Sequence, residues 1–348
     1  MKKNWHLPPI KESNVPFENR YPHQVGFLLM DICNLSCSHC FLSTIDDNGV
    51  PRLNGEFASG FMEIDKFHKI VDRLEDVLIN SKRVSLTSVE ALFHPNIWEM
   101  FHHIREINND ITFVVGSNGL LLNEKNILKL KEIGNIDLGI SLDGHKKETV
   151  EKFKTGVNFD RVIRNLKLLK QHNVEYRTTF VSHKNNIEEL VDYVDFVRDL
   201  GASSIKVNTL CPYDIQLSDK TLVSKGKTEL EEIERVYVVA KKRANKLGID
   251  LFYRRTYIEP LGCGYASYEM FIDMDGNVVP CNHFIRPDTF ALFGKVIKPK
   301  QIRYGNVLDE DPIKIWKKSN CVSFRKTLHD RKLPTECSGC PQGLLGVT

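Results

Sequence analysis

Six apolar runs of strand type alternate with segments of helical period before about residue 250, and this alternation limits the fold more than any other feature. The runs are Gln24–Met30, Arg83–Thr87, Ile111–Gly116, Ile136–Leu142, Tyr176–Val181 and Ser204–Leu210. Several are almost continuously apolar, which is typical of strands covered on both faces of a parallel sheet. Successive strand–helix units predict right-handed crossovers and an α/β barrel or open sheet, with the chemistry at the carboxyl ends of the strands.

The segments between these strands have the apolar spacing of amphipathic helices. One apolar stripe runs through residues 64–78 and another through residues 187–197. Each stripe can cover one face of a sheet while the opposite side of the helix stays polar. The other expected helices are Asn96–Asn108, Asn123–Ile133, Phe159–His172 and Thr228–Leu247.

The pattern changes after about residue 250. Residues 267–280 predict a β-hairpin, because Asp275-Gly276 supplies a tight turn between two apolar runs. A helix near Ile313–Ser319 and a cysteine-rich tail follow, and so small a unit is expected to need a metal site for stability. We predict an N-terminal extension, an α/β unit and a small α+β unit, at residues 1–23, 24–250 and 251–348.

Composition narrows the class of protein. The N-terminal segment is polar and interrupted by prolines, and no stretch approaches the ~20 apolar residues that span a bilayer. The net charge is only +3 and the basic residues are dispersed, so no track for nucleic acid is expected. We predict a cytoplasmic protein with no membrane or nucleic-acid partner, whose nine cysteines are thiols or metal ligands and not disulfides.

Three of these cysteines, Cys33, Cys37 and Cys40, lie in a short loop directly after the first strand. Iron–sulfur clusters are usually held by four cysteine thiolates. Three ligands from one loop would leave one iron open for another molecule. The alternative is a zinc site in which His39 is the fourth ligand.

The spacing of the three cysteines resembles the signature of the radical S-adenosylmethionine (SAM) family. The resemblance implies a partial (β/α)6 barrel with a small C-terminal iron–sulfur domain. It also implies that SAM chelates the open iron of a [4Fe-4S] cluster and, after one-electron reduction, yields a 5′-deoxyadenosyl radical. That radical would abstract a hydrogen atom from the substrate.

Other segments resemble the same family at successive strand ends. His39 lies where the family usually has an aromatic residue near the adenine. Glu90 lies in the segment that holds the SAM amino group, although the two glycines and the proline usual in that segment are replaced. Ser117 and Asn118 follow the third strand, and Ser141 occupies the usual position of a ribose contact after the fourth.

Four more cysteines, Cys263, Cys281, Cys337 and Cys340, lie in the C-terminal unit. Their spacing alone fits zinc and an iron–sulfur cluster about equally well. Their arrangement around the hairpin and the final C-x-x-C resembles the SPASM domain in its short, twitch form. That resemblance implies one auxiliary [4Fe-4S] cluster, which transfers electrons or supports the structure.

Two cysteines stand outside both clusters. Cys211 follows the sixth strand, where it would face the reaction chamber, whereas Cys321 is expected to be structural. In the radical SAM family that this chain resembles, enzymes that invert a stereocentre use such a thiol as a hydrogen-atom donor, so the resemblance implies this role for Cys211. The alternative is that Cys211 is a buried, unreactive thiol. Further polar residues expected near the substrate are Arg177, Asn208, Arg254, Arg255, Tyr257 and His283.

The cysteine layout as a whole resembles a twitch-type dehydrogenase of aminocyclitol antibiotic synthesis. It implies a small polar substrate, similar to an amino sugar or cyclitol, that is oxidised to a ketone or epimerised, with flavodoxin or ferredoxin as electron donor. The short segment before the first strand favours this reading over a maturase that crosslinks a ribosomally made peptide or forms a D-residue in it. A zinc-stabilised, non-enzymatic binding protein is the third reading.

Overall fold

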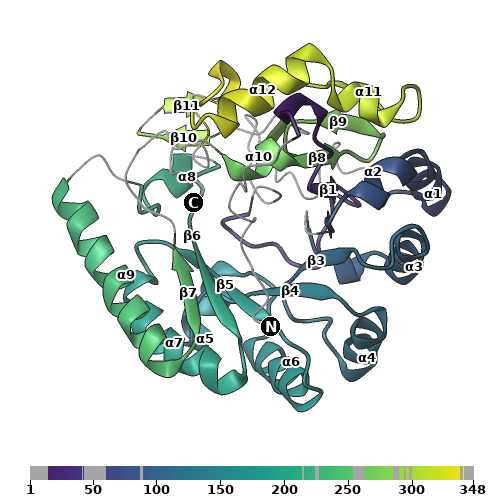
Figure 1. The fold of residues 1–348 in the computed structure, drawn as a ribbon. Helices are drawn as coiled ribbons and strands as arrows, with labels where there is room; N and C mark the ends of the chain where they lie inside the picture. Colours follow the sequence, from purple (N-terminus) through teal and green to yellow (C-terminus); the bar gives the residue numbers. More distant parts are fainter. Residues whose placement is uncertain are drawn as a thin grey trace.

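A ten-stranded sheet, in the order β12-β9-β8-β1-β2-β3-β4-β5-β6-β7, forms the centre of the molecule (Figure 1). The computed structural model describes residues 15–40, 42, 60–86, 89–213, 215–223, 227–253, 263–284, 290–293, 295–297, 300–337 and 340. From β8 to β7 in this order, every neighbouring pair is parallel. The barrel strands are β1 (Gln24–Phe27), β2 (Arg83–Ser85), β3 (Thr112–Ser117), β4 (Ile136–Ser141), β5 (Arg177–Ser182), β6 (Ser204–Thr209) and β7 (Asp250–Tyr253).

The mixed α/β class with a parallel sheet is thus confirmed, and each of the six expected runs overlaps a strand, although β3 and β5 each end one residue later than expected. The near-continuous apolar runs account for this, because β1 is buried at all four positions and β4 at five of six. Strand β7 was not among the strands predicted from the sequence. It pairs with β6 and extends the parallel sheet to residue 253.

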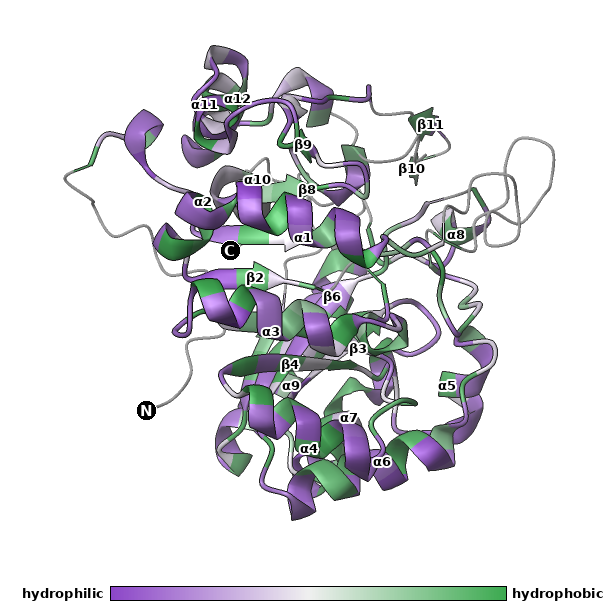
Figure 2. Ribbon diagram, turned by 90° about the vertical axis from the view of Figure 1, so that its right-hand side faces the viewer, coloured by the Kyte–Doolittle hydropathy of each residue, from purple (hydrophilic) through white to green (hydrophobic). Residues whose placement is uncertain are grey.

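Helices cover the outer face of the sheet, and Figure 2 shows apolar and polar residues side by side on them. The barrel helices are α1 (Ile64–Arg73), α2 (Glu75–Asn80), α3 (Ile97–Ile107), α4 (Glu124–Ile133), α5 (Lys147–Phe153), α6 (Phe159–Gln171), α7 (Leu190–Leu200), α8 (Ile215–Ser218) and α9 (Lys227–Leu247). Among the described residues, no helix is long and apolar enough to cross a membrane.

The single stripe expected through residues 64–78 is divided between two helices. Leu74 separates α1 from α2, with φ −92° and ψ 6°. Its N–H donates to the carbonyls of both Ile70 (3.1 Å) and Val71 (3.0 Å), so the first helix tightens at its last turn. Leu74 itself is fully buried, which explains why the apolar spacing continues across the break.

The C-terminal part adds β8, β9 and β12 to the main sheet and a separate two-stranded sheet of β10 and β11. Antiparallel pairing of β8 with β9 confirms the expected hairpin, and Gly276 in its turn has φ 88°. β8 also pairs in parallel with β1, so one sheet crosses the boundary proposed near residue 250. The elements are α10 (Gly264–Tyr268), β8 (Glu269–Ile272), β9 (Asn277–Val279), β10 (Phe290–Leu292), β11 (Lys295–Ile297), β12 (Gly305–Asn306), α11 (Pro312–Trp316) and α12 (Ser319–His329).

A row of paired charged and polar side chains crosses the amino ends of the strands. Arg83 on β2 and Arg177 on β5 both pair with the buried carboxylate of Asp137 on β4. Arg83 Nε also donates to Gln24 Oε1 (3.2 Å), and Gln24 Nε2 donates to Glu269 Oε1 (2.9 Å). The expectation that Arg177 contacts substrate is therefore wrong, because the first residue of β5 lies at the opposite end of the sheet from the carboxyl ends.

Glu269 is expected to make folding stability depend on pH. Burial raises its pKa to about 7, from 4.5, although Gln24 and Arg83 act in the opposite direction. At a pH between 4.5 and 7, the Glu269 carboxyl is protonated in the folded chain and ionised in the unfolded chain. The free energy of unfolding therefore falls by about 3 kcal/mol as the pH rises through this range. Glu269→Gln should therefore gain thermal stability relative to the parent protein at pH 8 but not at pH 4.5. An equal difference between the two unfolding midpoints at both pH values would contradict this.

Candidate active site and metal centres

The first cysteine loop lies at the carboxyl end of β1 and is held by backbone hydrogen bonds to the segment after α5. Ser36 N donates to Thr155 O (3.1 Å) and Ser38 N donates to Phe153 O (3.0 Å). Within the loop, Cys40 N donates to Cys37 O (3.0 Å). The loop geometry therefore depends on the chain that follows β4, far away in sequence.

The thiols of this loop are poorly suited to ionise without a positive partner. Burial raises the pKa of Cys37 to about 11, while the Lys154 ammonium lowers it. Burial also raises the pKa of Cys33. A bound metal deprotonates a coordinating thiol outright, so this set of three partly buried cysteines fits a metal better than it fits free thiolates.

Glu90 has the arrangement expected of a residue that receives a cationic group. Its carboxyl is buried, and Oε2 accepts a hydrogen bond from Asn118 N (2.6 Å). Oε1 is buried and has no hydrogen-bond partner in the described part of the chain. Burial raises the pKa of Glu90 to about 7, an effect that the bond from Asn118 limits. A donor such as an ammonium group would satisfy Oε1 and favour the carboxylate form.

Asn118 links Glu90 to the cysteine loop. Its side chain donates to Asn34 Oδ1 (2.8 Å), inside the loop, while its backbone N–H is held by Glu90. The Ser117 hydroxyl accepts a hydrogen bond from Gly119 N (3.0 Å), and the Ser117 side chain also acts to lower the pKa of Glu90. Asn118 thus contacts the loop directly and Glu90 is linked to the loop through Asn118, while Ser117 supports the turn beside them.

Lys154 is a buried cation at this site that sequence reasoning missed. Its ammonium donates to the backbone oxygen of Ser141 (2.5 Å) and to the Ser141 hydroxyl (2.8 Å), and it lies 3.2 Å from Asp143 Oδ2. It also interacts electrostatically with Cys37 and Glu90. A lysine after a short amphipathic helix gives no sequence signal of burial, so the tertiary fold alone reveals it.

His39 lies against the same carboxylate. His39 Nε2 is 3.8 Å from Asp143 Oδ2, and its ring is 6.4 Å from that of Phe153 between centroids. Burial would raise the pKa of Asp143, but Lys154 and then His39 outweigh it and lower that pKa. The charge of Asp143 is therefore kept at neutral pH, and it holds Lys154 and His39 in place beside the loop.

The four C-terminal cysteines form a second group. Burial raises the pKa of Cys281 well above its usual value, and Cys340, Cys263 and Cys337 each add to this. Burial likewise raises the pKa of Cys337, with further contributions from Cys340 and Cys263. Four cysteines whose thiolate forms would repel one another have the composition of a donor set for a metal centre. No three metal-binding side chains of the described residues are close enough to hold one ion, and a cluster of several irons spreads its thiolates further apart.

Cys211 lies just beyond β6 and is buried. The chain that follows it is tied to β10, because Ala291 N donates to Pro212 O (2.8 Å). Tyr213 stacks against the same element, with its ring 5.8 Å from Phe290 and 6.0 Å from His283 between centroids. Cys211 is therefore placed between the barrel and the C-terminal part.

The other expected substrate contacts have mixed outcomes. Asn208 lies on β6, and its Oδ1 is buried without a hydrogen-bond partner among the described residues, so it can still receive a donor. His283 is buried beside Tyr213 and Phe290. The remaining candidates lie outside the described residues: Arg254, Arg255 and Tyr257.

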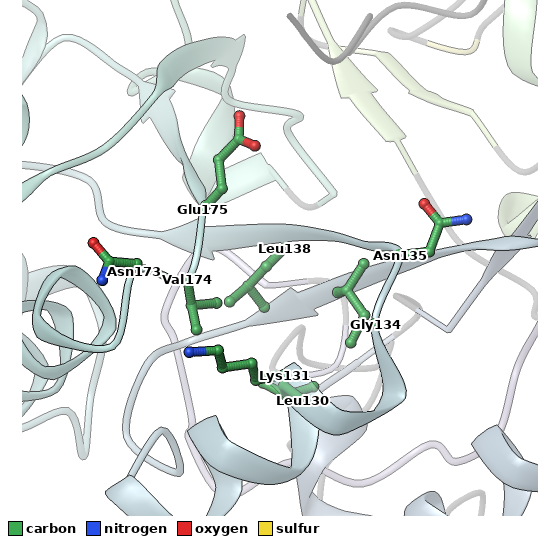
Figure 3. A pocket seen from close by; sticks show the side chains of 9 residues that line it. Leu130, Lys131, Gly134, Asn135, Leu138, Asn173, Val174 and Glu175 are labelled. Atoms are coloured by element: carbon green, nitrogen blue, oxygen red, sulfur yellow. The ribbon is translucent and has the colours of Figure 1, made fainter. Parts of the chain in front are cut away.

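A small depression of about 120 Å³ lies elsewhere, at the amino ends of β4 and β5. Figure 3 shows Leu130, Leu138 and Val174 among its lining residues. Strands β1, β4 and β5 run in one direction, so this depression is at the opposite end of the sheet from the cysteine loop. We place the active site at the carboxyl ends, where the titratable groups converge.

Comparison with known families agrees with this division of the chain. The model of the radical SAM superfamily matches residues 27–197, which include the first cysteine loop, Glu90 and Lys154. The SPASM model, described as an iron–sulfur cluster-binding domain, matches residues 263–341, which include the second group of cysteines.

Individual proteins are similar over most of the chain. The AdoMet-dependent heme synthase of Methanosarcina barkeri is 22% identical over 339 residues, which cover 92% of this chain and 88% of the relative. The antilisterial bacteriocin subtilosin biosynthesis protein AlbA of Bacillus subtilis is 28% identical over 336 residues, 92% of this chain and 67% of AlbA.

A solved fold is also similar. Structures of Streptococcus suis SuiB, bound to S-adenosylmethionine and to the precursor peptide SuiA, give TM-scores of 0.64 and 0.63 at 18% and 16% identity. Each covers 93% of this chain, and 72% and 71% of the respective SuiB chains.

Proposed function

Because this chain belongs to the radical SAM superfamily and carries a SPASM iron–sulfur domain, we propose that it abstracts a hydrogen atom from a carbon of a ribosomally made peptide. The observation that carries the proposal is the likeness to AlbA, a bacteriocin biosynthesis protein, over 92% of this chain. The fold is also that of SuiB, which has been solved with a precursor peptide. The peptide replaces the small amino-sugar or cyclitol substrate that the cysteine layout favoured.

The residues at the carboxyl ends of β1 to β4 take the roles of cofactor holders in this proposal. Cys33, Cys37 and Cys40 hold a [4Fe-4S] cluster, which together with SAM supplies a 5′-deoxyadenosyl radical. Glu90 accepts a hydrogen bond from the SAM amino group through the oxygen that has no partner within the described residues. Lys154 offsets the negative charge of the thiolates and of Glu90.

Cys211 returns a hydrogen atom to the peptide in the proposed reaction, and one electron from the external reductant plus one proton then convert the resulting thiyl radical back to the thiol. Its thiol is buried at the carboxyl end of β6, where a carbon radical could take its hydrogen. Hydrogen return from the face opposite to abstraction inverts the carbon, so the product is a D-residue. Asn208, three residues earlier, offers a buried amide oxygen to a peptide N–H.

The test uses the reconstituted protein with SAM and dithionite in D2O, and short peptides encoded next to its gene. Epimerisation adds one deuterium to the peptide, because the Cys211 thiol exchanges with solvent, and it forms 5′-deoxyadenosine. Cys211→Ala should still form 5′-deoxyadenosine but lose at least ~100-fold of the deuterium-labelled product. Cys321→Ala, which removes another buried thiol, is the matched control.

A second candidate function is favoured by the likeness to the heme synthase, because the match covers 88% of the length of that protein. That candidate replaces the peptide by a small substrate such as a tetrapyrrole. The same assay separates the two. Turnover of an iron-porphyrin with no mass change in any peptide would reject the peptide proposal. A peptide that loses two hydrogens would support a peptide substrate but would reject Cys211 as the hydrogen-atom donor.

A further inference from the structure

Tyr304 is fixed beside the second group of cysteines by contacts from two sides. Its backbone N–H donates to Val278 O (2.8 Å) on β9, and its carbonyl accepts from Lys318 Nζ (2.8 Å). Its ring lies 6.4 Å from that of Phe324 on α12, between centroids. Only 6% of the residue is exposed, so neither the backbone nor the ring is free to move toward water.

The hydroxyl of this buried side chain has no hydrogen-bond partner among the residues that the structure describes. The phenol does interact electrostatically with the thiols of Cys321 and Cys337. Cys337 in turn interacts with Cys340 and Cys263, so Tyr304 stands at the edge of the four-cysteine group. Buried hydroxyls are nearly always paired, and each exception requires an explanation.

Neighbouring protein groups do not supply the missing acceptor. Arg325, whose charge also acts on Tyr304, carries only donors. Cys321 and the exposed carboxylate of Glu336 also act on the phenol electrostatically, but neither accepts a hydrogen bond from the hydroxyl. The other group that acts on it, Cys337, belongs to the four-cysteine group, and the family assigns to this domain an iron–sulfur cluster, whose sulfur atoms are acceptors.

We propose that the Tyr304 hydroxyl donates a hydrogen bond to a sulfur of the auxiliary cluster and thereby raises its reduction potential. The added electron makes the cluster more negative, so a donor aimed at its sulfur stabilises the reduced state more than the oxidised state. Burial raises the pKa of Tyr304, so the phenol keeps its proton at neutral pH. This proposal goes beyond the proposed function and does not depend on which substrate the enzyme takes.

The experiment is a redox titration of the auxiliary cluster, followed by electron paramagnetic resonance. It uses the full chain with Cys33, Cys37 and Cys40 replaced by alanine, so that the C-terminal cluster alone gives the signal. Tyr304→Phe removes the hydroxyl and keeps the ring. At a fixed potential near the midpoint, the ratio of reduced to oxidised cluster should fall about tenfold, equivalent to ~59 mV for one electron.

Tyr176→Phe is the matched control. Tyr176 is also a fully buried tyrosine, but its hydroxyl donates to Leu200 O (3.0 Å) in the barrel. It should leave the midpoint unchanged. A Tyr304→Phe protein with a full cluster and an unchanged midpoint would overturn the proposal.

A second measurement keeps the proposal testable if Tyr304→Phe fails to retain its cluster. Electron–nuclear double resonance of the reduced cluster, with Tyr304 in place, should detect a strongly coupled proton that exchanges slowly in D2O. Incorporation of tyrosine labelled with ¹⁷O at the phenol assigns it, because only the hydroxyl proton is bonded to the labelled oxygen. The absence of any such proton would overturn the proposal without the variant.

Discussion

Replacing Cys33, Cys37 and Cys40 together by alanine is expected to abolish SAM cleavage and to halve the iron content. The reconstituted parent protein should hold about eight irons per chain and the variant about four, because each cluster contains four. The second group of cysteines has four members that interact with one another, so we expect it to need no ligand from the barrel loop. Iron, sulfide and zinc are measured in both proteins after anaerobic reconstitution.

Two comparisons make this result interpretable. Cys321→Ala should keep the full iron content, because this thiol is buried against Arg325 and is not among the groups that act on Cys281. A triple variant that holds zinc and no iron would show that the C-terminal site is a structural clip. Loss of all metal from the triple variant would mean that the two centres are not independent.

Asp137→Ala is expected to give the largest loss of folding stability of any single change discussed above. Asp137 is 2% exposed and pairs with both Arg83 and Arg177. Removing the carboxylate leaves two guanidinium groups without their anion inside the sheet. Loss of one partner from a buried ion pair costs about 3–5 kcal/mol, which is a large part of the stability of most domains.

Thermal unfolding of the reconstituted protein measures the effect. Asp195→Ala is the matched control, because Asp195 also pairs with an arginine, Arg243, but both side chains are 38% exposed. Exposed pairs contribute little, so this variant should unfold almost as the parent does. Equal shifts in the two variants would show that the buried row at the amino ends of the strands is not a major source of stability.

The sequence was most informative where a physical requirement is local. Apolar runs and apolar stripes indicate which faces of a strand or helix are buried, and the spacing of the cysteines indicates a loop that can hold a metal. The positions of β1 and of the hairpin at Gly276 followed from such local patterns.

Residues whose role depends on distant partners could not be found in this way. Lys154 resembles any surface lysine until α5 places its ammonium beside Ser141 and Asp143. Arg177 was misplaced for the converse reason. It is a polar residue next to a strand, and only the strand direction shows that it lies at the amino end with Asp137.

Pairing between β1 and β8 has a consequence for how the protein can be divided. The strand that leads into the radical-generating loop has β2 on one side and β8 on the other. A Cβ at Gly26 would clash with the carboxylate of Glu269, so β1 and β8 pack closely at this point. A barrel expressed without residues after 250 would expose the bare edge of β1, which is a template for pairing with other chains. The C-terminal part is thus also expected to protect the barrel from pairing with other chains along the edge of β1.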